Sequence, residues 1–112
     1  MRQGRVIAEH KSTFPNPLIA AIGDSVNVGR RDDEYPGWFW CTDSKGISAW
    51  VPESYLQIEG ARGKFVMDYN SFELSIGADE MLEIIEETGG WCWCIRETGE
   101  MGWLPAEKVE VF

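Results

Sequence analysis

Hydrophobic and polar residues alternate along several short stretches of this chain. In "WCWC" at 91–94, tryptophan and cysteine alternate. On a strand, Trp91 and Trp93 would therefore share one face, and Cys92 and Cys94 the other. Residues 25–28, "SVNV", alternate in the same way. Such segments are rich in Val, Ile, Trp and Tyr and are separated by Gly and Pro, which predicts an all-β fold of small barrels.

The chain also contains an internal repeat. The segment "GWFWCTDSKGISAWVPESYLQI" at 37–58 aligns with "GWCWCIRETGEMGWLPAEKVEV" at 90–111 at an offset of 53, and upstream stretches align at offsets of 56 and 59. Each copy has three tryptophans at matching places, and the match is specific because tryptophan is rare. We therefore predict two tandem β-barrel domains, residues 1–59 and 60–112, joined by the linker "IEGARGK".

One stretch allows a second interpretation. Residues 79–87, "DEMLEIIEE", place four apolar residues at helical spacing. The matching stretch of the first copy, "DSVNV" at 24–28, has the period of two that favours a strand. We expect strands in both copies, and no helix longer than the single turn that can follow Pro52 and Pro105.

The Cys-x-Cys pair could be a metal clip, a redox couple or part of a packed strand. The first copy has Phe39 at the position of Cys92, and a buried cysteine behaves as a small hydrophobic residue. A metal site would need further ligands, and the only histidine, His10, lies in the other copy. We therefore expect packed, reduced thiols, and neither a metal nor a cofactor.

Composition and charge narrow the possible functions. The chain has 112 residues, 44% hydrophobic and 26% charged, as in soluble globular proteins. It has no apolar run near the ~20 residues of a membrane span and no apolar export signal at its start, so we expect a cytoplasmic protein. The net charge is -9, with six basic and eight acidic residues in 1–61 and four and eleven in 62–112. That field disfavours nucleic acid and favours a basic partner.

The second copy resembles the Src homology 3 (SH3) family over nearly its whole length. The resemblance rests on an opening strand at 65–69, "ELS" at 73–75, Trp91 at the start of a strand, the G-x-x-G-W-x-P run from Gly99 to Pro105, and a closing apolar strand at 109–111. The first copy matches the later half of this pattern, down to "WVPESYL" at 50–56. The resemblance, to a bacterial-type variant, implies two five-stranded SH3-like barrels with a shallow aromatic groove for an extended, proline-rich peptide.

The resemblance also implies which residues line each groove. In the first copy they are His10, Trp38, Trp50, Pro52 and Tyr55. In the second copy they are Tyr69, Trp91, Trp103 and Pro105. Flat aromatic rings suit a preformed polyproline helix, which binds at little conformational cost.

The two copies depart from the family pattern in different ways. The closing tyrosine of the family is present as Tyr55 but is replaced by Lys108 in the second copy, which also has only "NSFE" at 70–73 where the family carries acidic residues. The first copy has a substitute for pairing with a basic ligand in the acidic residues before Trp38, namely Asp32, Asp33 and Glu34. We therefore expect the first groove to be the better peptide site.

These features predict a monomeric, non-catalytic tandem module that binds protein or peptide segments, proline-rich or basic, and neither nucleic acid nor membrane. The sequence has no phosphate-binding loop or paired-carboxylate site, and His10 has no nucleophile partner identifiable in the sequence. Two alternatives stay open. One is glycan or peptidoglycan binding through aromatic stacking, and the other is a structural unit whose aromatic faces are buried between the domains.

Overall fold

The computed structural model describes residues 2–13 and 16–112. Its regular elements are β-strands and two single-turn 3₁₀ helices, η1 (Glu53–Tyr55) and η2 (Ala106–Lys108), each directly after a proline. Residues Met81–Thr88 form a strand, β9, so the helical interpretation of 79–87 is excluded. The predicted all-β class and the two turns are confirmed. Within the described ranges, no helix is long and apolar enough to cross a membrane.

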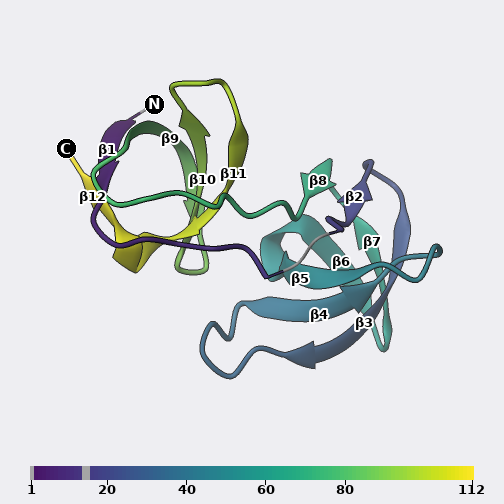
Figure 1. Cartoon of the computed structure of the whole chain (residues 1–112). Helices are drawn as coiled ribbons and strands as arrows, with labels where there is room; N and C mark the ends of the chain where they lie inside the picture. Colours follow the sequence, from purple (N-terminus) through teal and green to yellow (C-terminus); the bar gives the residue numbers. More distant parts are fainter. Residues whose placement is uncertain (1, 14–15) are drawn as a thin grey trace. The chain divides into compact units, whose positions relative to one another are not determined.

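The chain divides into two compact units (Figure 1). Unit 1 combines Met1–Pro15 with Phe72–Phe112, and unit 2 is Asn16–Ser71. The strands of unit 1 form one antiparallel sheet in the order β11-β10-β9-β1-β12. Besides β9 they are β1 (Arg2–Val6), β10 (Trp91–Arg96), β11 (Met101–Pro105) and β12 (Val109–Val111).

Unit 2 repeats this arrangement with a sheet in the order β5-β4-β3-β7-β6. Its strands are β3 (Ser25–Arg31), β4 (Trp38–Thr42), β5 (Ser48–Pro52), β6 (Leu56–Glu59) and β7 (Arg62–Phe65). A small second sheet pairs β2 (Ile19–Ala20) with β8 (Tyr69–Asn70). In unit 1 the single antiparallel bridge between His10 and Ile76 takes the corresponding place.

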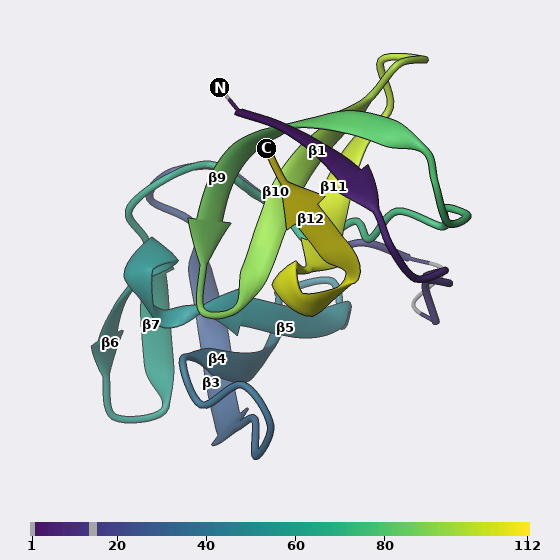
Figure 2. The same cartoon turned by 90° about the vertical axis from the view of Figure 1, so that its left-hand side faces the viewer.

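The opening strands of the two repeats are exchanged. β1, from the first repeat, lies between β9 and β12 of the second, and Gly4 is in register with both Leu82 and Val111; Figures 1 and 2 show the purple strand beside the green and yellow ones. β7, which we assigned to the second repeat, pairs with β3 and β6 of the first. The predicted ranges 1–59 and 60–112 therefore do not coincide with the compact units.

A tight turn explains this exchange. β6 and β7 form an antiparallel hairpin in which Glu59 is in register with Arg62, and its two-residue loop contains Gly60 at φ 61°. Two-residue hairpin loops favour positive φ, which glycine adopts at low cost. The predicted linker is thus a hairpin turn, and it commits β7 to β6. Because the first sheet is then complete, β1 fills the equivalent gap in the second.

The hydrogen-bond ladders of the described residues do not close either sheet into a barrel. β11 and β12 are the edges of the unit 1 sheet, and β5 and β6 are the edges of the unit 2 sheet. The observed architecture is therefore two open five-stranded sheets with one two-stranded sheet. This differs from the closed barrels expected from the repeat.

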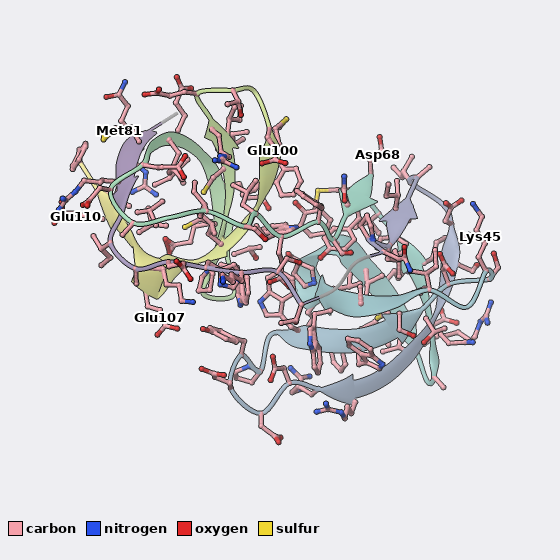
Figure 3. The ribbon with its side chains drawn as sticks, in the orientation of Figure 1. Lys45, Asp68, Met81, Glu100, Glu107 and Glu110 are labelled. Carbon is pink, nitrogen blue, oxygen red and sulfur yellow. The ribbon has the colours of Figure 1, made fainter. Side chains whose placement is uncertain are left out.

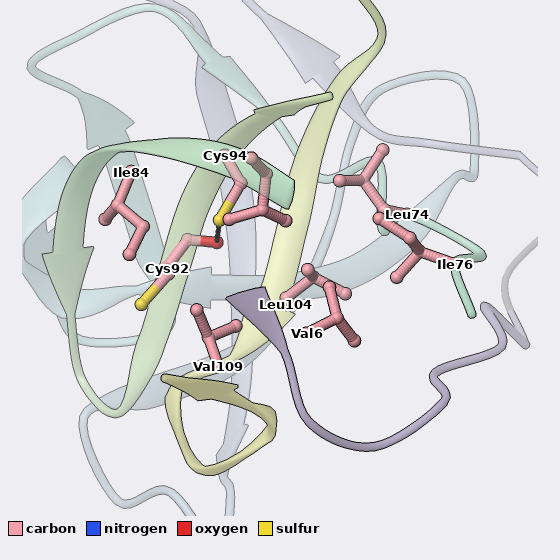
Figure 4. Packing of buried hydrophobic residues seen from close by; sticks show 9 residues of the cluster. Val6, Leu74, Ile76, Ile84, Cys92, Cys94, Leu104 and Val109 are labelled. Carbon is pink, nitrogen blue, oxygen red and sulfur yellow. Dashed lines mark hydrogen bonds between the residues drawn. The ribbon is translucent and has the colours of Figure 1, made fainter. Parts of the chain in front are cut away.

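Each unit has its own hydrophobic core. Figure 4 shows that of unit 1, where the buried residues are Val6, Leu74, Ile76, Leu82, Ile84, Cys92, Cys94, Leu104 and Val109. Their repeat partners in unit 2 are also buried at seven matching places: Phe65, Leu18, Ala20, Val26, Cys41, Val51 and Leu56. Charged side chains such as Lys45, Asp68, Glu107 and Glu110 are exposed and project away from the ribbon (Figure 3).

Candidate functional site

In both units, the third and fourth strands carry tryptophan and proline on the face opposite the core. In unit 2, Trp38 is in register with Pro52, and Trp40 with Trp50. Cys41, on the opposite face, is fully buried. Strand alternation therefore places one face of this strand pair in the core and gives the other face an aromatic surface.

Unit 1 has the same arrangement. Trp91 is in register with Pro105, and Trp93 with Trp103. The Trp93 and Trp103 rings meet edge to face with centroids 5.2 Å apart at 64°. Trp40 and Trp50 do the same at 5.0 Å and 64°. The repeat thus preserves a cross-strand aromatic pair together with its geometry, an arrangement that stabilises a sheet.

The aromatic rings of the two surfaces differ in exposure. Trp38 is 4% exposed and Trp103 2% exposed, and Pro52 and Pro105 are buried as well. Trp40, Trp50, Trp91 and Trp93 are half-buried. In unit 2 the accessible rings are therefore Trp40 and Trp50, whereas the predicted groove included Trp38 and did not include Trp40.

The exchange of opening strands also redistributes the predicted groove residues. His10, assigned to the first groove, packs edge to face on Trp91 of the second, with ring centroids 5.8 Å apart. Tyr69, assigned to the second groove, packs on Tyr55 of the first at 5.1 Å. The two predicted sets are corrected accordingly. The repeat could not reveal this, because both opening strands have the same pattern and either could serve either copy.

In unit 2, Tyr69 connects the turn η1 to the aromatic surface. Its hydroxyl donates a hydrogen bond to the carbonyl oxygen of Trp50 at 2.7 Å, and its ring stacks on Phe65 with centroids 5.8 Å apart. Tyr55 and Tyr69 are 8% and 4% exposed. The Tyr55 and Tyr69 rings and the β5 backbone at Trp50 are therefore held together by ring contacts and this hydrogen bond.

In unit 1 the equivalent positions carry polar groups. His10 takes the place of Tyr69 and Lys108 the place of Tyr55. His10 Nδ1 lies 3.1 Å from Lys108 Nζ, and His10 Nε2 lies 2.9 Å from Glu73 Oε1. Glu73 was absent from the predicted site. The short loop "NSFE" gives no sign that its glutamate meets a histidine 63 positions earlier.

Backbone pairing fixes the position of Glu73. It forms a parallel bridge with Trp103, and Leu74 N donates to Trp103 O at 3.1 Å. Glu73 also lines an open cleft of about 410 Å³, together with Phe72, Arg96 and Glu100. Arg96 donates to Glu100 at 2.8 Å and to Glu80 at 2.9 Å, and its guanidinium holds the pKa of the Glu80 carboxyl below the usual value.

The acidic loop predicted to attract a basic ligand is held by its own hydrogen bonds. Asp32 Oδ1 accepts from the Glu34 amide at 3.1 Å, and the Asp32 amide donates to Trp38 O at 2.8 Å. The Asp33 and Glu34 side chains are exposed. The neighbouring Arg31 pairs with Glu53 at 3.2 Å, which leaves the loop acidic beside the aromatic surface.

The cysteines belong to the cores. Cys41 and Cys94 are fully buried, and Cys92 is 1% exposed. Burial raises the pKa of the Cys41 thiol to about 12. A hydrogen bond with Cys92 and burial raise the pKa of Cys94. The predicted packing role is confirmed. Across residues 2–13 and 16–112, no group of three or more His, Cys, Asp or Glu side chains is placed to hold a metal ion.

Neither the protein-family models nor the solved structures contain a significant match to this chain.

Proposed function

We propose that this protein is a non-catalytic tandem interaction module of SH3-like architecture. Each unit would bind an extended peptide segment of a partner protein on the aromatic surface of its third and fourth strands. Unit 2 would use Trp40, Trp50 and the edges of Trp38 and Tyr55. Unit 1 would use Trp91 and Trp93.

One observation carries the proposal: the face of these strand pairs opposite the core also carries large aromatic residues. An antiparallel sheet that faces water on one side alternates hydrophobic residues inside with polar residues outside. Here Trp38 and Trp40 lie beside Pro52 and Trp50 on the face of β4 and β5 opposite Cys41, and the polar pair Thr42 and Ser48 continues that face. Trp38 and Pro52 are buried, so the half-buried Trp40 and Trp50 provide its accessible apolar surface. Contiguous apolar surface of this kind marks interaction sites, and tryptophan is among the residues most enriched in binding hot spots.

Charge supports a basic partner. The chain carries a net charge of -9, and the exposed Asp33 and Glu34 lie in the loop that leads into Trp38. A field of this sign attracts cationic segments and speeds their association. The Arg30 guanidinium lies 5.0 Å from the Trp50 ring centroid. The Trp50 ring thus already makes a cation–π contact with a residue of the same chain.

The test is a titration of isotope-labelled protein with a proline-rich peptide that carries arginines, and with a matched peptide in which glutamates replace them. We expect amide shifts around Trp40 and Trp50 with the arginine peptide. Trp50→Ala should weaken binding at least tenfold, about 1.4 kcal/mol. Ile19→Ala is the control, since Ile19 is a 67% exposed apolar residue of the same unit outside the aromatic surface. Equal effects of the two substitutions, or no shifts with any peptide, would contradict the proposal.

A structural role is the second candidate, because the burial of Trp38 and Trp103 favours it. On that hypothesis the aromatic surface stabilises the fold and has no ligand. Trp50→Ala would then lower the unfolding midpoint, and no peptide would shift the amides. A peptidoglycan fragment in the same titration distinguishes sugar stacking from peptide binding.

A further inference from the structure

His10 is the only histidine of the chain, and both of its ring nitrogens are engaged. Nδ1 lies 3.1 Å from the Lys108 ammonium, and Nε2 lies 2.9 Å from the Glu73 carboxylate. The residue is 9% exposed. The ring is therefore held between a cation and an anion, largely out of water.

These two partners define the protonation state of the ring. An ammonium can only donate hydrogen bonds, so Nδ1 must be an unprotonated acceptor. A carboxylate can only accept, so Nε2 must carry the proton. The arrangement therefore requires neutral His10 in its Nε2–H tautomer. A protonated ring would present two donors and would place a second cation 3.1 Å from Lys108.

The charged groups near the ring determine which contact gives way. They are Glu73, Lys108, Glu9, Lys11 and Glu107. Glu9 contributes its carbonyl oxygen to Lys108 Nζ at 3.2 Å, and its carboxylate pairs with Lys11 at 3.8 Å with both side chains exposed. Glu107 precedes Lys108 in η2 and is exposed. Beyond Glu73, Arg96 and Glu100 line the same cleft, and the Trp91 ring on β10 is uncharged.

Protonation changes the two hydrogen bonds of His10 in opposite directions. The contact with Glu73 becomes an ion pair and strengthens. The contact with Lys108 becomes a repulsion between like charges. Lys108 has a flexible four-carbon stem and a strongly hydrated ammonium, so it is the group that moves into water.

The other repeat lacks this chemistry. Tyr69 and Tyr55 occupy the equivalent positions and meet ring to ring at 5.1 Å. Histidine changes its charge between about pH 5 and pH 8, whereas tyrosine does not. The backbone contact is the same in both units: Ile7 N donates to Lys108 O at 2.8 Å, and Val66 N donates to Tyr55 O at 2.9 Å. Unit 2 is thus an internal control.

We propose that His10 and Lys108 form a pH-sensitive latch in unit 1. Neutral His10, whose ring packs on Trp91, accepts a hydrogen bond from the Lys108 ammonium and so holds it in place. Protonated His10 releases it and frees η2 to move. The latch is independent of the proposed peptide binding, because it is measured from signals of the protein itself with no peptide added.

The test is a nuclear magnetic resonance titration of the full chain from about pH 8 to about pH 5. The ring signals need no assignment by mutagenesis, since His10 is the only histidine. At high pH we expect the Nε2–H tautomer. On acidification, the Lys108 side-chain signals and the amides of Ile7 and Val109 should shift with the same midpoint as the ring. The amides of Tyr55 and Val66 should show no transition at that midpoint.

A double variant, His10→Tyr with Lys108→Tyr, places in unit 1 the residue types of the Tyr69–Tyr55 pair of unit 2 and is the control. It should lose the transition at Ile7 and Val109. Lys108→Met keeps the histidine and should retain the ring titration while losing the coupled shift of Val109. The latch is refuted by an Nδ1–H tautomer at high pH or by Lys108 signals that do not shift as the ring titrates. It is also refuted if the double variant keeps the transition of the Ile7 and Val109 amides.

Discussion

At the residue scale, Cys41 and Cys94 occupy the same position in the two repeats, and both are fully buried. Burial raises the pKa of Cys41 to about 12, and a hydrogen bond with Cys92 and burial raise the pKa of Cys94. Only the thiolate is nucleophilic. Both thiols should therefore resist alkylation in the folded chain, because they stay protonated and because packed side chains cover them.

We predict that iodoacetamide at about pH 8.5, the ordinary pKa of a cysteine thiol, leaves Cys41 and Cys94 unmodified in the native protein. Intact-mass measurement and peptide mapping provide the test, and denatured protein should gain three adducts, one for each cysteine in the sequence. Because the pKa of Cys41 is higher in the folded state, its contribution to stability is fully present below the ordinary thiol pKa and is lost as pH rises toward about 12. Rapid native alkylation of Cys41 would contradict the burial.

At the element scale, each exchanged strand crosses its sheet at a glycine with no room for a side chain. A Cβ on Gly4 would lie 2.9 Å from the Glu110 carbonyl oxygen and 3.0 Å from Ile84 Cδ1. A Cβ on Gly63, the repeat partner in β7, would lie 2.9 Å from Val28 Cγ2. The first obstacle is backbone in the neighbouring strand, and the second is the end of a half-buried side chain.

We predict that Gly4→Ala lowers the free energy of unfolding by about 1–3 kcal/mol, because β1 and β12 must move apart. Gly63→Ala should cost less. The Val28 side chain can rotate away, whereas the Glu110 carbonyl oxygen is part of the backbone of β12. In both variants the loss of backbone freedom in the unfolded chain offsets part of the strain by about 0.4–1 kcal/mol. Urea unfolding of the two matched variants measures the difference. Equal losses would show that β1 does not lie against β12 as described.

At the scale of the whole molecule, the two units differ in continuity. Unit 2 is a single stretch, Asn16–Ser71, whereas unit 1 needs Met1–Pro15 as well as Phe72–Phe112. β1 lies between β9 and β12 and contributes the fully buried Val6 to the core. Without β1, the unit 1 sheet is cut in two.

We predict that a fragment of residues 16–71 folds alone, with dispersed amide signals and a cooperative thermal transition. A fragment of residues 72–112 should stay unfolded and should become ordered when a peptide of residues 1–13 is added. Far-ultraviolet circular dichroism and amide spectra measure both outcomes. A fragment of residues 1–59 that folds as well as 16–71 would contradict the strand exchange.

The sequence by itself determined much of the local structure. Alternation in "WCWC" placed the cysteines in the core and the tryptophans on the other face, as observed for Cys92 and Cys94. The match with "DSVNV" gave the strand at Met81–Thr88, and the prolines gave the two 3₁₀ turns. These features depend on residues a few positions apart, so a single sequence contains the whole signal.

Only the tertiary structure decided which opening strand completes which sheet. "GRVIA" at 4–8 and "GKFVM" at 63–67 have the same pattern, so either could fill either gap. The Gly60 hairpin was the local signal that could have resolved this, since it ties β7 to β6. The exchange then brought Tyr69 to Tyr55, and it brought His10 to Glu73 and Lys108. Sequence patterns specify how a strand alternates, but its partners depend on contacts far apart in the chain, whose chain-closure entropy and packing are set only when the whole fold forms.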